Sequence, residues 1–232
     1  MAKRIVKRLL GLLGFEIRKI PQIEEPGSLL YSYLKADGSF DYERYRQIQT
    51  EGNRLKIGLV WAVEENIAFL SRYIVDTIGA PRFGICHGTR RGKEQEWFSR
   101  YLGCDVIGTE ISDTADQFPR TIRWDFHEAK PEWQDAADFI YSNSFDHSYD
   151  PPKCLSTWMS CVRKGGLCFL EHSSLHGPSA VSELDPFGAD IVQMPYLITM
   201  WGRGKYGVRE LLTAPRKSNS AKYLHFIVIQ RF

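Results

Sequence analysis

The sequence has few cysteines, and none is spaced as a zinc site or a disulfide framework requires. Their number is odd, and no CxxC pair occurs among Cys86, Cys104, Cys154, Cys161 and Cys168. Most of them lie in apolar stretches, where the reduced cysteines of cytoplasmic proteins are found. The sequence therefore predicts no disulfides, no structural zinc and a cytoplasmic protein.

The chain also lacks a large charge of either sign. Its formal net charge is +2, yet the first 20 residues hold six Lys or Arg and a single acid, which leaves 24 basic and 27 acidic residues in the remainder. A mildly acidic body argues against a nucleic-acid substrate, since such substrates are held through phosphate contacts to Lys and Arg. We expect no nucleic-acid partner.

Residues 1–20 predict a basic amphipathic helix. At about 100° per residue, the apolar residues from Ile5 to Leu13 fall within one arc of roughly 160°, and Lys and Arg occupy the opposite arc. The segment is too short to span a bilayer and has no small-residue cleavage site. Two alternatives stay open: the helix lies on an acidic membrane surface, peripheral on the inner face of the membrane, or it packs on the domain or a dimer partner.

The length of 232 residues suits one α/β domain with an appendage. We expect a linker over 21–27 within a linker and helical segment over 21–62, and one domain over 63–232. Strands are predicted at 82–86, 104–109, 121–124, 138–142 and 166–171, and helices at 41–54, 63–78, 92–102 and 151–163. This alternation indicates a doubly wound, mostly parallel sheet with helices on both faces. Residues 208–212 and 224–232 predict a terminal antiparallel hairpin at the sheet edge.

Residues 173–206 lose periodicity and gain Gly, Pro and aromatic residues. Long irregular segments in compact domains are usually lids or binding loops. We interpret this segment as one that shapes a substrate site. The alternative is a surface insertion that merely covers the sheet.

Polar residues follow the predicted strands, at the carboxyl ends where open parallel sheets bind ligands. These ends read His87-Gly88-Thr89, Glu110-Ile111, Asp125-Phe126, Asn143-Ser144 and Glu171-His172. In addition, residues 83–94 pass from a β-prone run through a glycine-containing turn into a helix, which brings backbone N–H groups to a nucleotide-type cofactor. An acid about 20 residues later, Glu110, stands where a ribose diol would be held.

With these motifs, residues 63–232 resemble a class I, Rossmann-like S-adenosylmethionine-dependent methyltransferase of the small-molecule branch. Ser142 to Pro151 resembles the fourth motif of that branch, and Lys164 to Glu171 resembles the turn and fifth strand that follow. The terminal hairpin fits the same fold and is foreign to dehydrogenases. The resemblance implies a seven-stranded sheet. More narrowly, the chain looks like methyltransferase-domain proteins of bacterial surface-polysaccharide synthesis.

The resemblance implies S-adenosyl-L-methionine as cofactor. Gly88 matches the glycine approached by the methionine part, and Glu110 matches the acid that accepts both ribose hydroxyls. Asp125 matches the acid that takes the adenine amino group, with Phe126 beside the ring. The cofactor-binding set so implied is Cys86, His87, Gly88, Thr89, Arg90, Gly92, Glu94, Glu110, Ile111, Asp125, Phe126, Asn143 and Ser144.

The first motif departs from the family. Gly84, Cys86 and Arg90 stand where an acid and two glycines are usual. The cofactor's ammonium group could be held by Glu94 or by the carbonyl of Cys86, and Gly92 could restore the flexibility lost at Arg90. Arg90 either holds the cofactor carboxylate or is a solvated or ion-paired loop arginine.

Methyl transfer often needs a base on the acceptor, and three histidines are candidates. His147 and His172 are expected to face the methyl group, and His87 is a weaker candidate. Asp146 could orient a histidine or contact the acceptor, whereas capping the next helix suits Asp150 better. Each histidine could instead be structural. A metal held by Asp146, His147 and His172 has no spacing signature, so none is predicted.

The sequence thus favours O-methylation of a hydroxylated small molecule or glycan, because sugar faces stack on aromatic residues such as those of 173–206. The membrane surface is one place where such an acceptor could be presented. One alternative is an NAD-dependent oxidoreductase, which needs G-x-G-x-x-G where this chain offers Gly88-x-x-x-Gly92. The other is a non-catalytic protein of the same fold that binds a membrane or a partner. The oligomeric state and the acceptor are left open.

Overall fold

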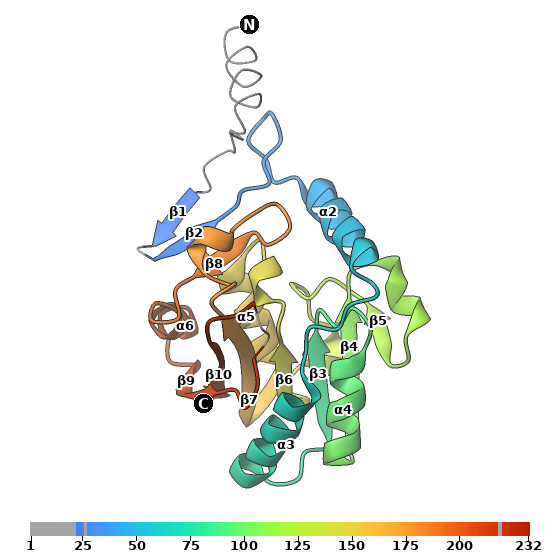
Figure 1. Ribbon diagram of the computed structural model, residues 1–232. Coiled ribbons are helices and arrows are strands. Elements are labelled where there is room, and N and C mark those ends of the chain that lie inside the picture. Colours follow the sequence, from blue (N-terminus) through green and yellow to red (C-terminus); the bar gives the residue numbers. More distant parts are fainter. Residues whose placement is uncertain (1–21, 26, 218–219) are drawn as a thin grey trace, which may run out of the picture.

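A computed structural model describes residues 22–25, 27–217 and 220–232 (Figure 1). The predicted amphipathic helix over 1–20 lies outside the described residues. None of the helices that are described is both long and apolar enough to cross a lipid bilayer.

The main sheet has seven strands in the order β5-β4-β3-β6-β7-β10-β9. They span β3 Phe83–His87, β4 Asp105–Glu110, β5 Thr121–Arg123, β6 Ala137–Ser142, β7 Val162–Ser173, β9 Tyr206–Thr213 and β10 Leu224–Arg231. The first five of these pair in parallel, whereas β10 runs antiparallel to both β7 and β9. The predicted doubly wound sheet with a terminal antiparallel hairpin is confirmed.

Helices cover both faces of this sheet. Neighbouring residues of a strand point to opposite faces, so each central strand packs against helices on both sides. Phe139 packs with α3 (Glu64–Ile78) and α4 (Lys93–Leu102), and the adjacent Ile140 packs with α5 (Pro151–Cys161) and α6 (Met194–Gly202). Every strand of the centre is apolar on both faces, as a parallel sheet buried on both sides requires. The Asp150 side chain caps α5 by accepting a hydrogen bond from the backbone N–H of Lys153 at 3.1 Å, as expected.

A second, smaller sheet joins segments far apart in sequence. Strand β1 (Gln22–Glu25) pairs antiparallel with β2 (Ser28–Leu30), which pairs with β8 (Phe187–Ala189). The expected linker over 21–27 is therefore in part a strand. Local sequence does not reveal this, since the pairing partner of β2 lies more than 150 residues away.

The expectation of irregular structure over 173–206 is also wrong in part. The segment contains a short 3₁₀ helix (Pro178–Ala180), β8 and the helix α6. Its prolines do not break α6, because Pro195 lies in the first turn, where a missing N–H costs nothing. Leu197 and Ile198 then bury the inner face of the helix.

Helix α2 (Tyr42–Leu55) lies across the carboxyl ends of the sheet, beside β4 and β5 (Figure 1). Its predicted bounds, 41–54, are close to those observed. Asp41 caps it by accepting from the N–H of Arg44 at 3.2 Å. This position makes α2 a wall of the cleft described below, which its charged sequence did not indicate.

Candidate active site

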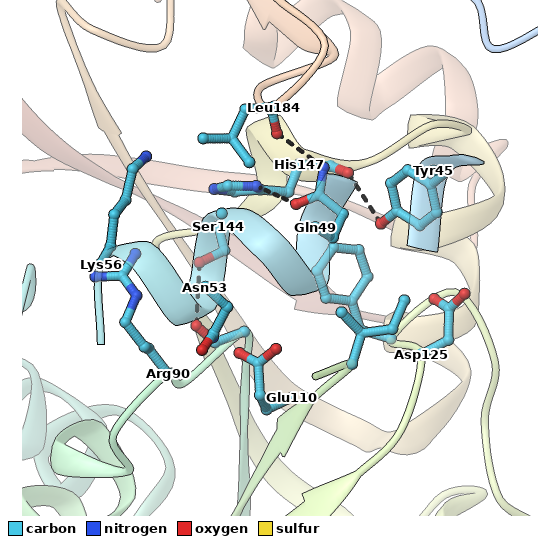
Figure 2. Close-up of a pocket in the computed structure, with 14 residues that line it drawn as sticks. Tyr45, Gln49, Asn53, Lys56, Arg90, Glu110, Asp125, Ser144, His147 and Leu184 are labelled. Carbon is cyan, nitrogen blue, oxygen red and sulfur yellow. Dashed lines mark hydrogen bonds between the residues drawn. The ribbon is translucent and has the colours of Figure 1, made fainter. Parts of the chain in front are cut away.

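A narrow cleft lies between α2 and the carboxyl ends of β3, β4 and β6 (Figure 2). Its wall includes eight residues predicted for the cofactor or for catalysis: Gly88, Arg90, Glu110, Ile111, Asp125, Phe126, Ser144 and His147. It opens beside a second cavity, and Gly88, Arg90, Ser144 and His147 line both. Glu94, Asn143 and Asp146 line the second cavity.

The turn after β3 requires glycine at position 88. Gly88 has a φ of +73°, and a Cβ added there would lie 2.6 Å from the Cβ of Ser144. The backbone N–H of Gly88 donates to the carbonyl of Thr109 at 2.9 Å, and the Ser144 hydroxyl donates to the Gly88 carbonyl at 3.2 Å. The turns after β3 and β6 are thereby held together at the floor of the cleft.

Glu110 is the last residue of β4 and its side chain faces the cleft. The residue is 6% exposed, and its Oε1 accepts a hydrogen bond from the N–H of Ser112 at 2.8 Å. Burial raises the pKa of Glu110 to about 7, against the opposing effects of the Ser112 N–H and the Arg90 charge. A buried carboxylate at this edge is a strong acceptor for paired hydroxyls.

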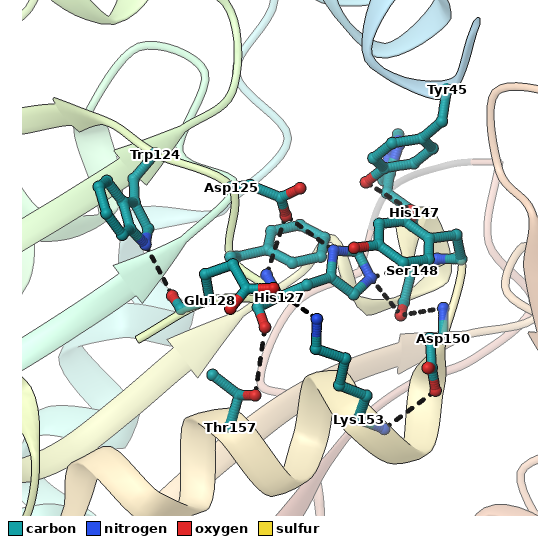
Figure 3. Close-up of polar contacts among 12 residues, drawn as sticks. Tyr45, Trp124, Asp125, His127, Glu128, His147, Ser148, Asp150, Lys153 and Thr157 are labelled. Atoms are coloured by element: carbon teal, nitrogen blue, oxygen red, sulfur yellow. Dashed lines mark hydrogen bonds and ion pairs between the residues drawn. The ribbon is translucent and has the colours of Figure 1, made fainter. Parts of the chain in front are cut away.

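Asp125, after β5, is held by a network that includes a histidine the sequence did not single out (Figure 3). Its Oδ1 accepts from the backbone N–H of His127 at 2.9 Å and lies 2.8 Å from His127 Nδ1. Its Oδ2 accepts from the hydroxyl of Tyr42 at 2.9 Å. Burial acts to raise the pKa of Asp125, but the hydrogen bonds and charge of His127 outweigh it, and the pKa falls below its usual value.

His127 is fully buried, and its second ring nitrogen, Nε2, also has hydrogen-bond partners. Nε2 lies 2.8 Å from the Ser148 hydroxyl and accepts from the N–H of Tyr149 at 3.3 Å, so Nδ1 carries the proton donated to Asp125. The ring stacks on that of Tyr149 with centroids 3.7 Å apart. The signal for this role was the Asp-x-His spacing, since an Asp side chain commonly accepts from the N–H two residues on.

Helix α2 supplies four further residues of the cleft that were not predicted, Tyr45, Gln49, Gly52 and Asn53, and Lys56 lines it directly after the helix (Figure 2). Tyr45, Gln49 and Asn53 recur every four residues, so they share one helix face. The available signal was a row of uncharged polar residues on one face of an otherwise charged helix.

Gln49 fixes the orientation of His147. The amide Nε2 of Gln49 donates to the carbonyl of Leu184 at 2.8 Å, so its Oε1 is the acceptor that faces His147 Nδ1 at 2.7 Å. His147 Nδ1 therefore carries a proton, and its Nε2 points toward Asp185, whose Oδ1 is 3.6 Å away. The backbone carbonyl of His147 accepts from Tyr45 at 3.1 Å.

The second cavity has a volume of about 490 Å³ and combines an aromatic wall with acidic groups. Trp61, 38% exposed, lines it and donates through Nε1 to Glu171 Oε1 at 3.0 Å. Glu171 also accepts from Tyr141 at 2.7 Å, and burial raises its pKa to about 7. Because Glu171 anchors Trp61, the strand β7 contributes to this wall indirectly.

Arg90 and Glu94, which lie in or next to the unusual first motif, face this cavity. Arg90 lines it, donates to the carbonyl of Leu59 at 3.3 Å, and burial lowers its pKa. Its Nε is buried and has no hydrogen-bond partner within the described part of the chain. Glu94 is buried, accepts from Asn143 at 3.4 Å, and burial raises its pKa.

Several predicted residues do not line either cavity. Cys86 points into the core beside α3 and α4, and Thr89 and Gly92 form the turn itself, where the Gly92 N–H donates to the Thr89 carbonyl at 2.6 Å. The His87 ring stacks on Trp158 with centroids 4.6 Å apart, and burial lowers its pKa to about 3. His87 is thus placed as a core residue.

The expectation that His172 faces the cleft is wrong. Strand β7 extends to Ser173, so His172 lies within the strand and points to the opposite face from Glu171. Its Nε2 donates to the carbonyl of Ala189 at 2.9 Å, and burial lowers its pKa to about 4. It lines a separate small cavity beside Phe187.

No family model and no curated protein matches the chain. Among solved structures it is similar to the 1,6-didemethyltoxoflavin-N1-methyltransferase of Burkholderia thailandensis, with a TM-score of 0.63 and 12% identity over 92% of this chain and 99% of that one. It is also similar to the magnesium protoporphyrin IX methyltransferase of Synechocystis PCC 6803, with a TM-score of 0.56 and 10% identity over 84% and 99%. A third is the plantazolicin methyltransferase BpumL, with a TM-score of 0.55 and 14% identity over 82% and 88%. These likenesses establish the Rossmann-like methyltransferase fold.

Proposed function

We propose that this chain is an S-adenosyl-L-methionine-dependent methyltransferase acting on a hydroxylated small molecule. The observation that carries the proposal is Glu110, a buried carboxylate at the end of β4, facing a cleft in a sheet of the methyltransferase type. The three similar structures named above contain bound S-adenosylmethionine or S-adenosylhomocysteine. The bound cofactor supplies an electrophilic methyl group on a sulfonium.

The residues of the cleft suit the adenosine end of that cofactor. Glu110 would accept the ribose hydroxyls, Asp125 the adenine amino group, and Phe126 would lie beside the ring. Gly88 leaves open the space that a side chain would fill, next to Ser144. The cleft itself is small, about 50 Å³, whereas sites for such ligands usually measure about 300–1,000 Å³. Its volume calls for an outward shift of α2 on binding.

The methionine end would be held by residues other than the family's usual ones. We assign the cofactor carboxylate to Arg90, whose Nε is buried and unpartnered among the described residues. We assign the ammonium group to Glu94, with the Cys86 carbonyl as a second acceptor. Both side chains line the larger cavity, which supports the assignment.

The larger cavity would take the acceptor. His147 presents Nε2 to it at the boundary with the cleft, and we assign to His147 the activation of the acceptor hydroxyl, with Asp146 beside it. The segment 173–206 would shape the acceptor site through Leu175, His176 and Asp185. A sugar or glycan acceptor is favoured by the exposed Trp61 on the cavity wall, since sugar faces stack on aromatic rings. Membrane attachment would come from residues 1–20.

The test is binding of S-adenosylhomocysteine by isothermal titration calorimetry. We expect the wild type to bind and Glu110→Gln to bind about 10- to 100-fold more weakly, since hydrogen bonds to a charged group are worth about 1.5–3 kcal/mol. Glu132→Gln, which removes an exposed carboxylate, is the control and should bind as the wild type does. A wild type that binds no S-adenosylhomocysteine would contradict the proposal and favour the non-catalytic alternative.

The acceptor class is tested separately. Glycans and lipids from a strain that lacks the protein should contain a species lighter by one methyl group than its counterpart from the parent strain. Mass spectrometry of both extracts measures this difference. A missing methyl group on an amine or a thiol would instead argue against O-methylation.

A further inference from the structure

Three metal-ligating side chains meet where the cleft and the larger cavity join. Asp146 and His147 belong to a 3₁₀ helix (Phe145–His147) after β6, and Asp185 comes from the segment before β8. One ligand atom from each lies within 4.8 Å of the other two. This spacing allows all three to contact one ion.

Each of the three side chains offers an atom that can bind a cation. His147 Nδ1 holds a ring proton, because it donates to Gln49, so Nε2 is the atom left to bind a proton or a metal ion. Nε2 lies 3.6 Å from a carboxylate oxygen of Asp185, which is longer than a direct hydrogen bond. A metal ion bound between these two atoms would contact both.

Asp146 adds a second, independent sign of a missing donor. Its side chain is 11% exposed, and its Oδ1 is buried without a hydrogen-bond partner among the described residues. Its Oδ2 lies 3.7 Å from His176 Nε2, too far for a good hydrogen bond. An unpartnered buried carboxylate oxygen is costly, and a bound cation would satisfy it.

One of the protein's own cations, Lys56, lines both cavities. Within the described residues Lys56 makes no ion pair with Asp146 or Asp185. Its ammonium group therefore pairs directly with neither carboxylate in this structure.

We propose that Asp146, His147 and Asp185 bind one divalent metal ion. Two carboxylates and one imidazole suit Mn²⁺, Mg²⁺ or Zn²⁺, and three protein ligands leave coordination positions free. Those positions face the 490 Å³ cavity, so the fourth ligand would be a hydroxyl of the acceptor. The metal site stands on its own geometry, whereas the hydroxyl as its ligand rests on the proposed methyltransferase function.

A bound ion gives His147 its activating role through Nε2 as a ligand. A bound ion would make a coordinated hydroxyl more acidic, so that its proton would pass to water. The oxygen would then form a bond to the methyl carbon while the carbon–sulfur bond breaks and its electron pair stays on sulfur. Gln49 acts as a positioning residue, because its hydrogen bond to Nδ1 holds the ring in the ligating orientation.

The experiment is a titration of metal-free protein with Mn²⁺, in which free Mn²⁺ is measured by electron paramagnetic resonance without any cofactor. We expect one ion per wild-type chain, at least tenfold weaker binding by Asp185→Asn and His147→Gln, and about 10- to 100-fold weaker binding by Gln49→Leu. Asp76→Asn, exposed on α3, is the matched control and should bind as the wild type does. Circular dichroism verifies that each variant is folded.

The proposal is overturned if the wild type binds no Mn²⁺, Mg²⁺ or Zn²⁺ at millimolar concentration, or if Asp185→Asn binds as tightly as the wild type. The proposal is also overturned if Lys56→Met binds Mn²⁺ and the wild type does not, because the lysine would then occupy the site in the wild type. Calorimetry with S-adenosylhomocysteine in the absence of metal tests the proposed function independently. Metal uptake without cofactor binding would refute that function and leave the metal site standing.

Discussion

At the residue scale, Gly84 and Gly88 of the first motif are each required because a neighbouring side chain occupies the space that a Cβ would fill. A Cβ on Gly84 would lie 2.3 Å from Cζ of Phe139, so the ring occupies the space that an acidic side chain at this position would take. A Cβ on Gly88 would instead meet the side chain of Ser144. The departure at position 84 therefore follows from packing between β3 and β6.

Gly88→Ala should abolish binding of S-adenosylhomocysteine, because the two turns would move apart at the floor of the cleft. Gly103→Ala is the matched control: Gly103 has a φ of +65°, but an added Cβ there meets nothing within 4 Å. Both variants should lose about 1–2 kcal/mol of unfolding free energy from backbone strain, and Gly88→Ala should lose more. Urea unfolding and calorimetry measure the two effects. Equal losses in both variants would contradict the collision with Ser144.

At the element scale, α2 is bound to the cleft through polar contacts. Tyr42 donates to Asp125, Tyr45 to the carbonyl of His147, and Gln49 to the carbonyl of Leu184. Near its carboxyl end, Arg54 pairs with Asp113 at the surface. Because polar contacts can exchange for contacts with water, we expect α2 to be the wall of the cleft that moves when a ligand binds.

We predict that S-adenosylhomocysteine slows amide hydrogen exchange in α2, because the ligand, once α2 has shifted outward to admit it, adds contacts that hold the helix in place. Peptides of α3, which packs on one face of the sheet and lines neither cavity, serve as the internal control and should exchange at the same rate with and without ligand. Mass spectrometry of exchanged peptides measures both. Unchanged exchange in α2 alongside demonstrated binding would show that the cleft opens elsewhere.

At the scale of the whole molecule, buried carboxyls and buried histidines change the free energy of unfolding in opposite directions as the pH rises. Burial raises the pKa of Glu94 and of three further carboxyls, Glu110 and Glu171 to about 7 and Asp146 to about 6. Burial lowers the pKa of His127 and of three further histidines, His87 to about 3 and His172 and His176 to about 4. A carboxyl with a raised pKa loses its stabilising contribution as the pH rises, and a histidine with a lowered pKa loses its own as the pH falls. Between about pH 4.5 and 6.5 the two effects cancel in part.

Glu110→Gln should expose one of these effects. Relative to the wild type, the unfolding free energy of the variant should increase by about 3 kcal/mol from about pH 4.5 to about pH 8, because the wild-type carboxyl has a pKa of about 7 when folded and 4.5 when unfolded. Urea unfolding of the ligand-free proteins across this range measures the difference. If the difference in unfolding free energy between the variant and the wild type did not change with pH, burial would not raise the pKa of Glu110.

The sequence by itself determined the order of strands and helices. Alternating apolar runs and helical periodicity depend on near neighbours, so the elements from 63 onward are close to their predicted places, and the terminal hairpin is where it was expected. The polar strand ends followed from the same pattern, since parallel strands bring their carboxyl ends to one edge. Glu110 and Asp125 therefore line a single cleft.

The tertiary structure alone decided which side chains meet there. Asp185 joins Asp146 and His147 across almost 40 residues of chain, and α2 covers the cleft although its sequence reads as a solvated helix. The rotation of His172 away from the cleft depends on where β7 ends. Such juxtapositions are set by packing between distant segments, which leaves no periodic trace in the sequence.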